Sequence, residues 1–182
     1  IATGDILFFI HPDSILIDGW MDSMIKELNN KDVGVVGGLS IDQDGSTYLD
    51  AGFNWNWEEK KFNSIGKEIY NGIKISNPFT INNFPLDLLK SNNVDKVNGY
   101  FMAVRKKDYL FNGGMSPNLS SVEWADADFC MFMKEKGFKI ICQCNSQVIR
   151  EPLFKIDRKY NQGNVFFNNK WVASGRINSL VL

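Results

Sequence analysis

The sequence feature that most constrains the fold is an uninterrupted apolar run, Ile-Leu-Phe-Phe-Ile at residues 6–10. A continuous apolar run of this length is typical of a β-strand that is covered on both faces, as in α/β sheets. Pro12 has no backbone N–H to give to a sheet, so the strand should end before it and place Asp13 at the carboxyl edge, where such sheets bind ligands. Central strands seldom come first in a chain, and we therefore expect further sequence before residue 1.

The segments that follow alternate between helix and strand patterns. Residues 19–28 carry apolar side chains at helical spacing, and residues 33–36 form a short β-branched run typical of a buried strand. Within residues 39–49, two apolar stretches flank the turn sequence Asp-Gln-Asp-Gly, which predicts a hairpin. The same turn partly matches a calcium-binding loop, but Phe53 stands where the twelfth-position acid is needed. A simple turn is the favoured interpretation.

The second half of the chain continues the alternation. Residues 97–104 predict a strand, and residues 105–111 a short helix that ends before a Gly-Gly pair. Residues 138–144 alternate with a period of two, and residues 147–150 predict a further strand. The predicted fold class is α/β, a mixed sheet flanked by helices in a single domain.

Two stretches lack this regularity. Residues 54–95 are polar and rich in Asn, with aromatic side chains at no clear period, which predicts a long loop insertion with one short helix near residues 86–89. Residues 152–182 predict a C-terminal tail whose aromatic side chains can dock on the domain. Such loops carry binding surface or are simply pinned by their aromatic residues, and the sequence leaves both interpretations open.

Three carboxylates, Glu123, Asp126 and Asp128, are crowded into one short stretch. The apolar spacing that follows, together with Gly137 as a terminator, predicts a helix that begins near Asp126 and ends before residue 138. Acidic side chains commonly cap a helix N-terminus, where backbone N–H groups lower the pKa of a carboxylate. A carboxylate beside an indole at the rim of a sheet is also what an enzyme uses to take a proton from a hydroxyl group. Capping and catalysis are both open at this point.

Composition narrows the choice of partners. The 182 residues are 44% hydrophobic, enough for a core, and carry 20 basic and 21 acidic side chains, so the net charge predicts no nucleic-acid partner. Three cysteines at spacings that suit neither zinc nor a disulfide framework favour a reducing, cytoplasmic location. Cys142 and Cys144 share a strand face and are expected to be small core residues. No run of 18 apolar residues is present.

Several motifs occur in a fixed order along the chain. They are Ala2 to Ser14, Asp18-Gly19-Trp20-Met21, Val33 to Gly37, Asp42 to Gly45 with Ala51-Gly52-Phe53, Val97 to Arg105, Gly113-Gly114, Ala125 to Cys130 with Gly137-Phe138, and Asn164 to Phe167 with Lys170-Trp171. In this order they resemble the second, acceptor half of a family 2 glycosyltransferase domain of the GT-A fold. The resemblance implies that residues 1–182 form a truncated GT-A domain, a partial Rossmann-like mixed sheet, with the nucleotide-binding half expected before residue 1.

Enzymes of this family transfer a sugar from a nucleotide-sugar donor to a glycan or lipid-linked acceptor. For this chain the resemblance implies an inverting transferase in surface polysaccharide synthesis, with Asp126 as the catalytic base. It implies that Asp13 binds Mg²⁺ or Mn²⁺. It further implies that His11 and Arg150 bind the nucleotide-sugar donor.

The resemblance implies that the acceptor is bound by Glu123, Trp124, Gly99 and Gly114. The indole of Trp124 can stack on a sugar through its apolar face. Association with the inner face of the membrane is a further expectation. So is a homodimer, because an unpaired central strand would invite pairing with another chain.

Three positions depart from the family pattern. Ala125 stands where Glu is usual, His11 where an acidic or amide residue often precedes Pro-Asp, and Arg150 where many relatives carry a metal-binding His. Arginine cannot bind a cation but can bind a diphosphate, so metal dependence is in question. The departures favour a catalytically silent glycan-binding or assembly module, or an inactive fragment, whereas Asp13 and Asp126 favour the enzyme. A nucleotidyltransferase of related fold is a third alternative, but the sequence shows no Gly-rich activating loop.

Overall fold

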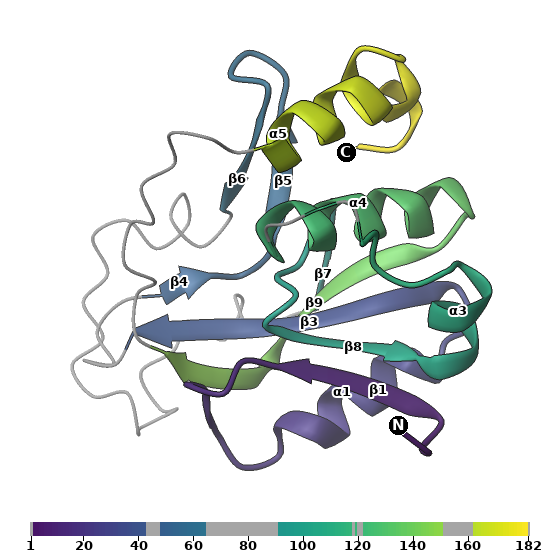
Figure 1. The fold of residues 1–182 in the computed structure, drawn as a ribbon. Coiled ribbons are helices and arrows are strands. Elements are labelled where there is room, and N and C mark those ends of the chain that lie inside the picture. Colours follow the sequence, from purple (N-terminus) through teal and green to yellow (C-terminus); the bar gives the residue numbers. More distant parts are fainter. Residues whose placement is uncertain are drawn as a thin grey trace.

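The computed structural model describes residues 2–42, 48–64, 91–117, 119, 122–150 and 162–181. Within these residues, seven strands form one mixed sheet and two more form a separate hairpin (Figure 1). The main path of the sheet is β1-β8-β3-β9-β2, with β4 paired to β3 and β7 paired to β9. Its strands are β1 (Ile6–Ile10), β2 (Ile15–Leu16), β3 (Val33–Asp42), β4 (Tyr48–Asp50), β7 (Asn92–Val94), β8 (Phe101–Arg105) and β9 (Lys139–Arg150). The predicted α/β class is confirmed.

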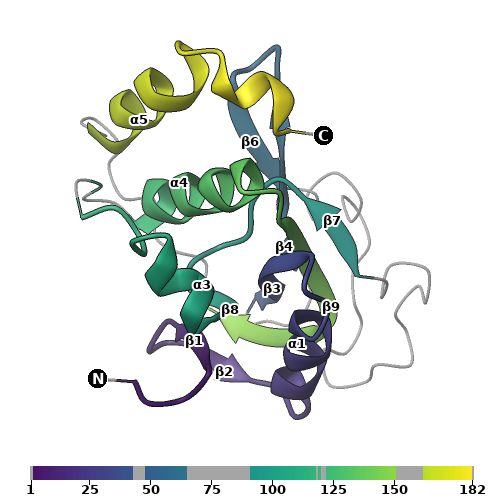
Figure 2. The same cartoon turned by 90° about the vertical axis from the view of Figure 1, so that its right-hand side faces the viewer.

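Helices cover both faces of this sheet, α1 on one side and α4 on the other (Figures 1 and 2). The helices are α1 (Trp20–Leu28), α3 (Lys106–Phe111), α4 (Val122–Glu135) and α5 (Gln162–Phe167). Met24 of α1 packs in one core cluster with Val36 of β3, whereas Phe129 of α4 packs in another with Val35. Successive strand residues point to opposite faces, so β3 is buried on both sides.

The apolar run at residues 6–10 forms β1, and helices cover both of its faces as predicted. Phe8 packs against Trp20 of α1, with ring centroids 5.1 Å apart, and Phe9 packs against Tyr109 of α3 at 5.3 Å. Within the described residues, however, β1 pairs with β8 alone and is an edge strand. The expected central position depends on further strands before residue 1 and stays a prediction.

The described parts of the stretch 54–95, which are residues 54–64 and 91–95, contain strands where a loop was predicted. β5 (Phe53–Asn56) and β6 (Lys61–Ser64) form an antiparallel hairpin, and β7 adds a strand to the main sheet. The strands were missed because their short, Asn-rich sequences show no clear alternation. The helix predicted near residues 86–89 lies outside the described residues.

The hairpin packs against α4 and the C-terminal segment to form a third core cluster. Trp55 of β5, Met131 of α4, and Phe167 and Trp171 of the C-terminal segment are buried in it. The predicted docking of the tail is confirmed for Trp171, whereas Val165 of the same tail is 63% exposed. The tail is helical where it is described: α5 continues into a π-helical turn at Asn168–Val172 and a 3₁₀ turn at Arg176–Ser179.

The two strands predicted in residues 138–150 are one long strand, β9. It runs parallel to β3, with a register shift between Gly38 and Leu39. β7 pairs with its first half and β2 with its second half. Cys142 and Cys144 are buried, as expected of small core residues.

The predicted hairpin at residues 39–49 is confirmed by the antiparallel pairing of β3 with β4, and its turn lies outside the described residues. Among the helices that the structure describes, none is both long enough and apolar enough to cross a membrane.

Candidate functional site

Three strands end at one edge of the sheet. β1 and β3 are both antiparallel to β8, and β9 is parallel to β3, so all three point the same way. Their carboxyl ends therefore share an edge. His11 directly follows β1, and Arg150 is the last residue of β9.

The turn that leads into β8 gathers the predicted site residues at this edge. The backbone N–H of Gly99 donates to Oδ2 of Asp126 at 2.8 Å. The carbonyl of Tyr100 accepts the N–H of His11 at 2.9 Å, and the guanidinium of Arg150 lies 3.7 Å from the centre of the Tyr100 ring. Residues from four separate segments thus meet around one turn.

Asp126 lies in the second turn of α4, because the helix begins at Val122 and not near Asp126 as predicted. Its side chain is only 1% exposed and forms an ion pair with Lys96, with 3.2 Å between Lys96 Nζ and Asp126 Oδ1. Asp126 is therefore not a capping residue of this helix. It is a buried carboxylate held between a helix and the turn before β8.

The pKa of Asp126 is raised from 3.8 to about 6. Burial is the main cause, since it disfavours the charged form, and the attraction of Lys96 and the hydrogen bond from Gly99 oppose it only in part. The lowered pKa of a capping carboxylate does not apply to Asp126, because this residue is buried in the second turn of the helix.

Asp128, another of the three carboxylates in this stretch, has a structural role. Trp171 Nε1 donates to its Oδ1 at 2.6 Å, and Lys170 Nζ lies 2.7 Å from the same oxygen. Asp128 therefore anchors the C-terminal segment to α4. The side chain of Glu123, the third of these carboxylates, is not among those that the structure describes.

Trp124 packs toward the third core cluster. Its ring centroid lies 5.1 Å from that of Phe167, and its buried Nε1 has no hydrogen-bond partner among the described residues. Gly114 has a φ of +70°, and a side chain there would meet the ring of Tyr109 at 2.8 Å. The loop beyond it comes near the site through Met115, whose methyl group would lie 3.5 Å from a Cβ at Gly99. The acceptor roles of Trp124, Gly99 and Gly114 stay predictions.

Asp13 is the predicted metal ligand, and its side chain is 70% exposed. Its backbone N–H lies 3.3 Å from Nδ1 of His11, and its Oδ2 lies 3.4 Å from the same nitrogen. No group of three His, Cys, Asp or Glu side chains gathers into a metal site within the described residues. One exposed carboxylate fits the mode in which Mg²⁺ or Mn²⁺ keeps waters and is bound mainly by substrate phosphates.

Arg150 is 2% exposed, and its Nε has no hydrogen-bond partner among the described residues. The hydroxyl of Tyr100, on whose ring it stacks, accepts from Asn98 Nδ2 at 2.7 Å and lies 3.3 Å from Ser40 Oγ. A buried guanidinium with an unused donor is well suited to bind an anion. The donor-side role that the resemblance implies for Arg150 stays a prediction.

Lys96 and Tyr100 also belong to the turn before β8 and are not among the site residues that the motifs indicate. Both lie in the run Val-Asp-Lys-Val-Asn-Gly-Tyr at residues 94–100, which was assigned in part to the loop and in part to the strand. The signal was a charged Asp-Lys pair between two valines, because charges inside an apolar run are usually paired.

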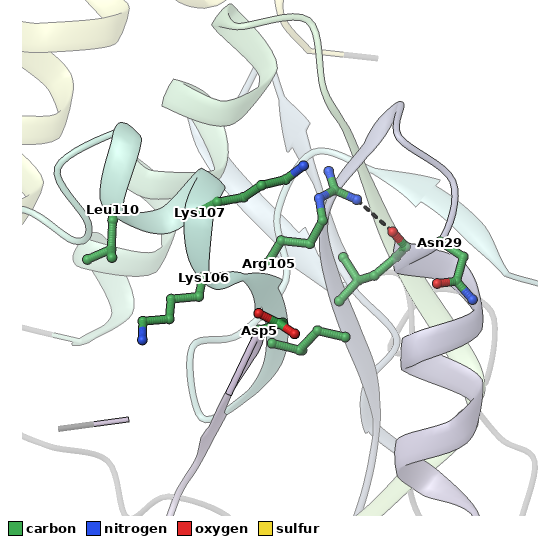
Figure 3. A pocket seen from close by; sticks show the side chains of 8 residues that line it. Asp5, Asn29, Arg105, Lys106, Lys107 and Leu110 are labelled. Atoms are coloured by element: carbon green, nitrogen blue, oxygen red, sulfur yellow. Dashed lines mark hydrogen bonds between the residues drawn. The ribbon is translucent and has the colours of Figure 1, made fainter. Parts of the chain in front are cut away.

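A hollow of about 560 Å³ lies at the opposite end of β1 (Figure 3). Its lining includes Asp5, Leu28, Lys106 and Leu110, and Arg105 donates from it to the carbonyl of Leu28 at 2.6 Å. The lining contains none of the predicted site residues. The hollow is therefore distinct from the candidate site.

The architecture is a mixed sheet between helices, consistent with a partial GT-A-like fold. Among the solved structures similar to this chain is a crystal structure of GalNAc-T7 with UDP, GalNAc and Mn²⁺. The TM-score is 0.63 and the sequence identity is 12%, over 92% of this chain and 32% of the other, so this chain spans about a third of that protein's length. No family model matches the sequence, and no curated protein matches it.

Proposed function

We propose that this chain is part of a glycosyltransferase that moves a sugar from a nucleotide-sugar to a glycan or lipid-linked hydroxyl, with inversion at the anomeric carbon. The observation that carries the proposal is the buried carboxylate of Asp126, hydrogen-bonded to Gly99 at the edge where three strands end. The UDP and Mn²⁺ in the GalNAc-T7 structure make them the first ligands to test. Surface polysaccharide synthesis is the proposed pathway.

In this reaction Asp126 takes the proton of the acceptor hydroxyl. The acceptor oxygen bonds to the anomeric carbon, the bond from that carbon to the diphosphate breaks, and its electron pair leaves with the nucleoside diphosphate. A pKa of about 6 keeps Asp126 mostly ionised at neutral pH and makes it a stronger base than an ordinary carboxylate. Glu123 and Trp124, on the same helix, are the proposed acceptor contacts.

Negative charge grows on the diphosphate as it leaves. Arg150 is proposed to bind it through parallel N–H groups, and His11 to lie beside it. A divalent cation held by Asp13 and the phosphates would neutralise the same charge.

Calorimetric titration of the 182-residue chain with UDP tests the donor site. We expect Arg150→Met to weaken UDP binding by about tenfold or more with or without Mn²⁺, since a bidentate charged contact is lost. Asp13→Ala should remove only the gain that Mn²⁺ gives. Lys107→Met, which changes the lining of the separate hollow, is the control and should bind as the wild type does. Absence of UDP binding under every condition would contradict the proposal.

A catalytically silent glycan-binding module is the second candidate. Ala125 in place of the usual Glu and the 1% exposure of Asp126 favour it. The two functions differ in how they depend on Asp126. An enzyme loses transfer in Asp126→Asn and keeps donor binding, whereas a silent module binds glycan equally in both forms and releases no UDP.

A further inference from the structure

Lys96 is a buried cation that bridges the helix and the turn of the candidate site. Its side chain is 3% exposed, and Nζ lies 3.2 Å from Oδ1 of Asp126 and donates to Oδ1 of Asn98 at 3.2 Å. A buried ammonium costs several kcal/mol of solvation unless it is paired. The position of Lys96 therefore depends on Asp126, and the position of Asp126 depends on Lys96.

The backbone of Lys96 is fixed by β5. The N–H of Phe53 donates to its carbonyl at 2.9 Å, and its own N–H donates to the carbonyl of Phe53 at 3.0 Å. The ammonium also lies 4.5 Å from the centre of the Phe53 ring. These contacts leave Nζ little freedom to move away from Asp126.

The other groups around Asp126 cannot replace this charge. The backbone N–H of Gly99, which donates to it, is a neutral group. The Cys130 thiol is neutral at physiological pH, because burial raises its pKa to about 12. Lys134, the next cation on α4, is paired with Asp95. Among the described residues, Lys96 is the cation that forms an ion pair with Asp126.

We propose that Lys96 is a positioning residue of the transfer reaction: its ammonium keeps the Asp126 carboxylate ionised and oriented toward the acceptor hydroxyl. The proposal rests on the proposed function, in which Asp126 is the base. Without Lys96, burial would act on Asp126 unopposed by a positive charge, and the carboxylate would hold its proton to higher pH.

Carbon-13 NMR titration of the Asp126 carboxyl group tests the pair in the 182-residue chain. We expect Lys96→Met to raise the titration midpoint by about one pH unit or more, and Lys96→Arg to restore most of the shift. Lys134→Met is the matched control: it removes a buried cation from a neighbouring ion pair and should move the midpoint far less. An unchanged midpoint in Lys96→Met, or an equal shift in Lys134→Met, would overturn the proposal.

If Lys96→Met does not fold, NMR titration of the wild-type chain tests the proposal instead. Protonation of Asp126 must disturb its partner, so the Lys96 Nζ resonance should shift with the same midpoint as the carboxyl resonance. Separate midpoints would overturn the proposal.

The pH profile of UDP release from a UDP-sugar then tests the link to catalysis. It should move upward in Lys96→Met together with the NMR midpoint, and a profile that stays in place would overturn the positioning role. UDP release from no form at any pH would overturn the proposed function and the positioning role with it. The NMR titration would still report on the ion pair.

Discussion

At the scale of single residues, the candidate site depends on one buried carboxylate. Asp126 accepts a hydrogen bond from Gly99 and pairs with Lys96, yet burial still raises its pKa to about 6. A carboxyl group that is harder to ionise in the folded chain than in the unfolded chain reduces stability at neutral pH. This cost is typical of residues kept for function rather than for stability.

This raised pKa predicts how stability depends on pH. Between about pH 4 and pH 6 the folded chain keeps a proton that the unfolded chain has released, so the free energy of unfolding falls as the pH rises. A pKa of about 6 against 3.8 corresponds to about 3 kcal/mol from this group. Urea denaturation across this range measures it.

The control for that measurement is the double variant Lys96→Met/Asp126→Asn, which removes both charges and leaves no buried ion unpaired. The free energy of unfolding of this variant should lack the pH-dependent contribution of Asp126, so its difference from that of the wild type should vary with pH. A constant difference between pH 4 and pH 7 would mean that Asp126 titrates normally.

Gly99 is the second residue whose identity the site requires. A Cβ there would lie 3.1 Å from Cβ of Asp126, so Gly99→Ala should push the turn away and break its 2.8 Å hydrogen bond. We expect a loss of about 1–3 kcal/mol in the free energy of unfolding. Gly4→Ala, where a Cβ meets nothing nearer than 3.8 Å, is the control and should lose far less. Equal losses in the two variants would contradict this account of the turn.

At the scale of elements, the β5–β6 hairpin positions the site from outside the main sheet. β5 fixes the backbone of Lys96, and Trp55 from the same strand packs against Phe62 of β6 and Phe167 of α5. The N–H of Trp55 also donates to Asp95 at 2.9 Å. The hairpin thus links the C-terminal segment to the segment that carries Lys96.

Two tryptophans of this hairpin give a matched test of that role. Trp55 is 4% exposed and Trp57 is 47% exposed. Trp55→Ala should lower the free energy of unfolding by about 3–5 kcal/mol, because a large cavity opens in the third cluster. Trp57→Ala should lower it by less than about 1 kcal/mol. Equal costs, measured by urea denaturation, would show that the hairpin is not packed as described.

The sequence predicted the elements whose pattern is local. The apolar run of β1, the helical spacing of α1 and the alternation in β9 depend on neighbouring residues, and each was found. The hairpin β5–β6 depends on contacts with α4 and α5, which are distant in sequence, so its short strands carry no clear periodic signal. The helix α4 begins at Val122, four residues before the predicted start near Asp126. The acidic residues of this stretch resemble a helix cap in sequence, although Asp126 lies inside the helix.

The sequence indicated several residues that gather at this turn, and their roles stay predictions, but it did not indicate the electrostatics of the turn. The motif order indicated Asp126, Gly99, His11 and Arg150, and the structure brings them around one turn. The Asp-Lys pair at residues 95–96 indicates a paired charge, but the sequence could not identify Asp126 as the partner of Lys96, because this pairing joins the segment before β8 to α4. The pKa of Asp126 could not be predicted either, since burial is a property of the whole fold.

At the scale of the whole molecule, the GT-A-like fold places the candidate site at one end of the parallel strands and the 560 Å³ hollow at the other. The two regions compete as ligand sites, because the hollow also carries cationic side chains from Arg105 and Lys106. Open α/β sheets bind ligands at the carboxyl ends of their strands, which favours the site around Asp126.

The most direct test of the central claim is therefore an amide NMR titration of the 182-residue chain with UDP and Mg²⁺, which locates the bound nucleotide. The account predicts shifts at His11, Asp13 and Ser14, at Asn98 to Tyr100 and at Arg150, with residues 105–107 unaffected. Shifts confined to residues 105–107, or none at all at saturating UDP, would contradict the claim that the carboxyl edge of this sheet is a nucleotide-sugar site.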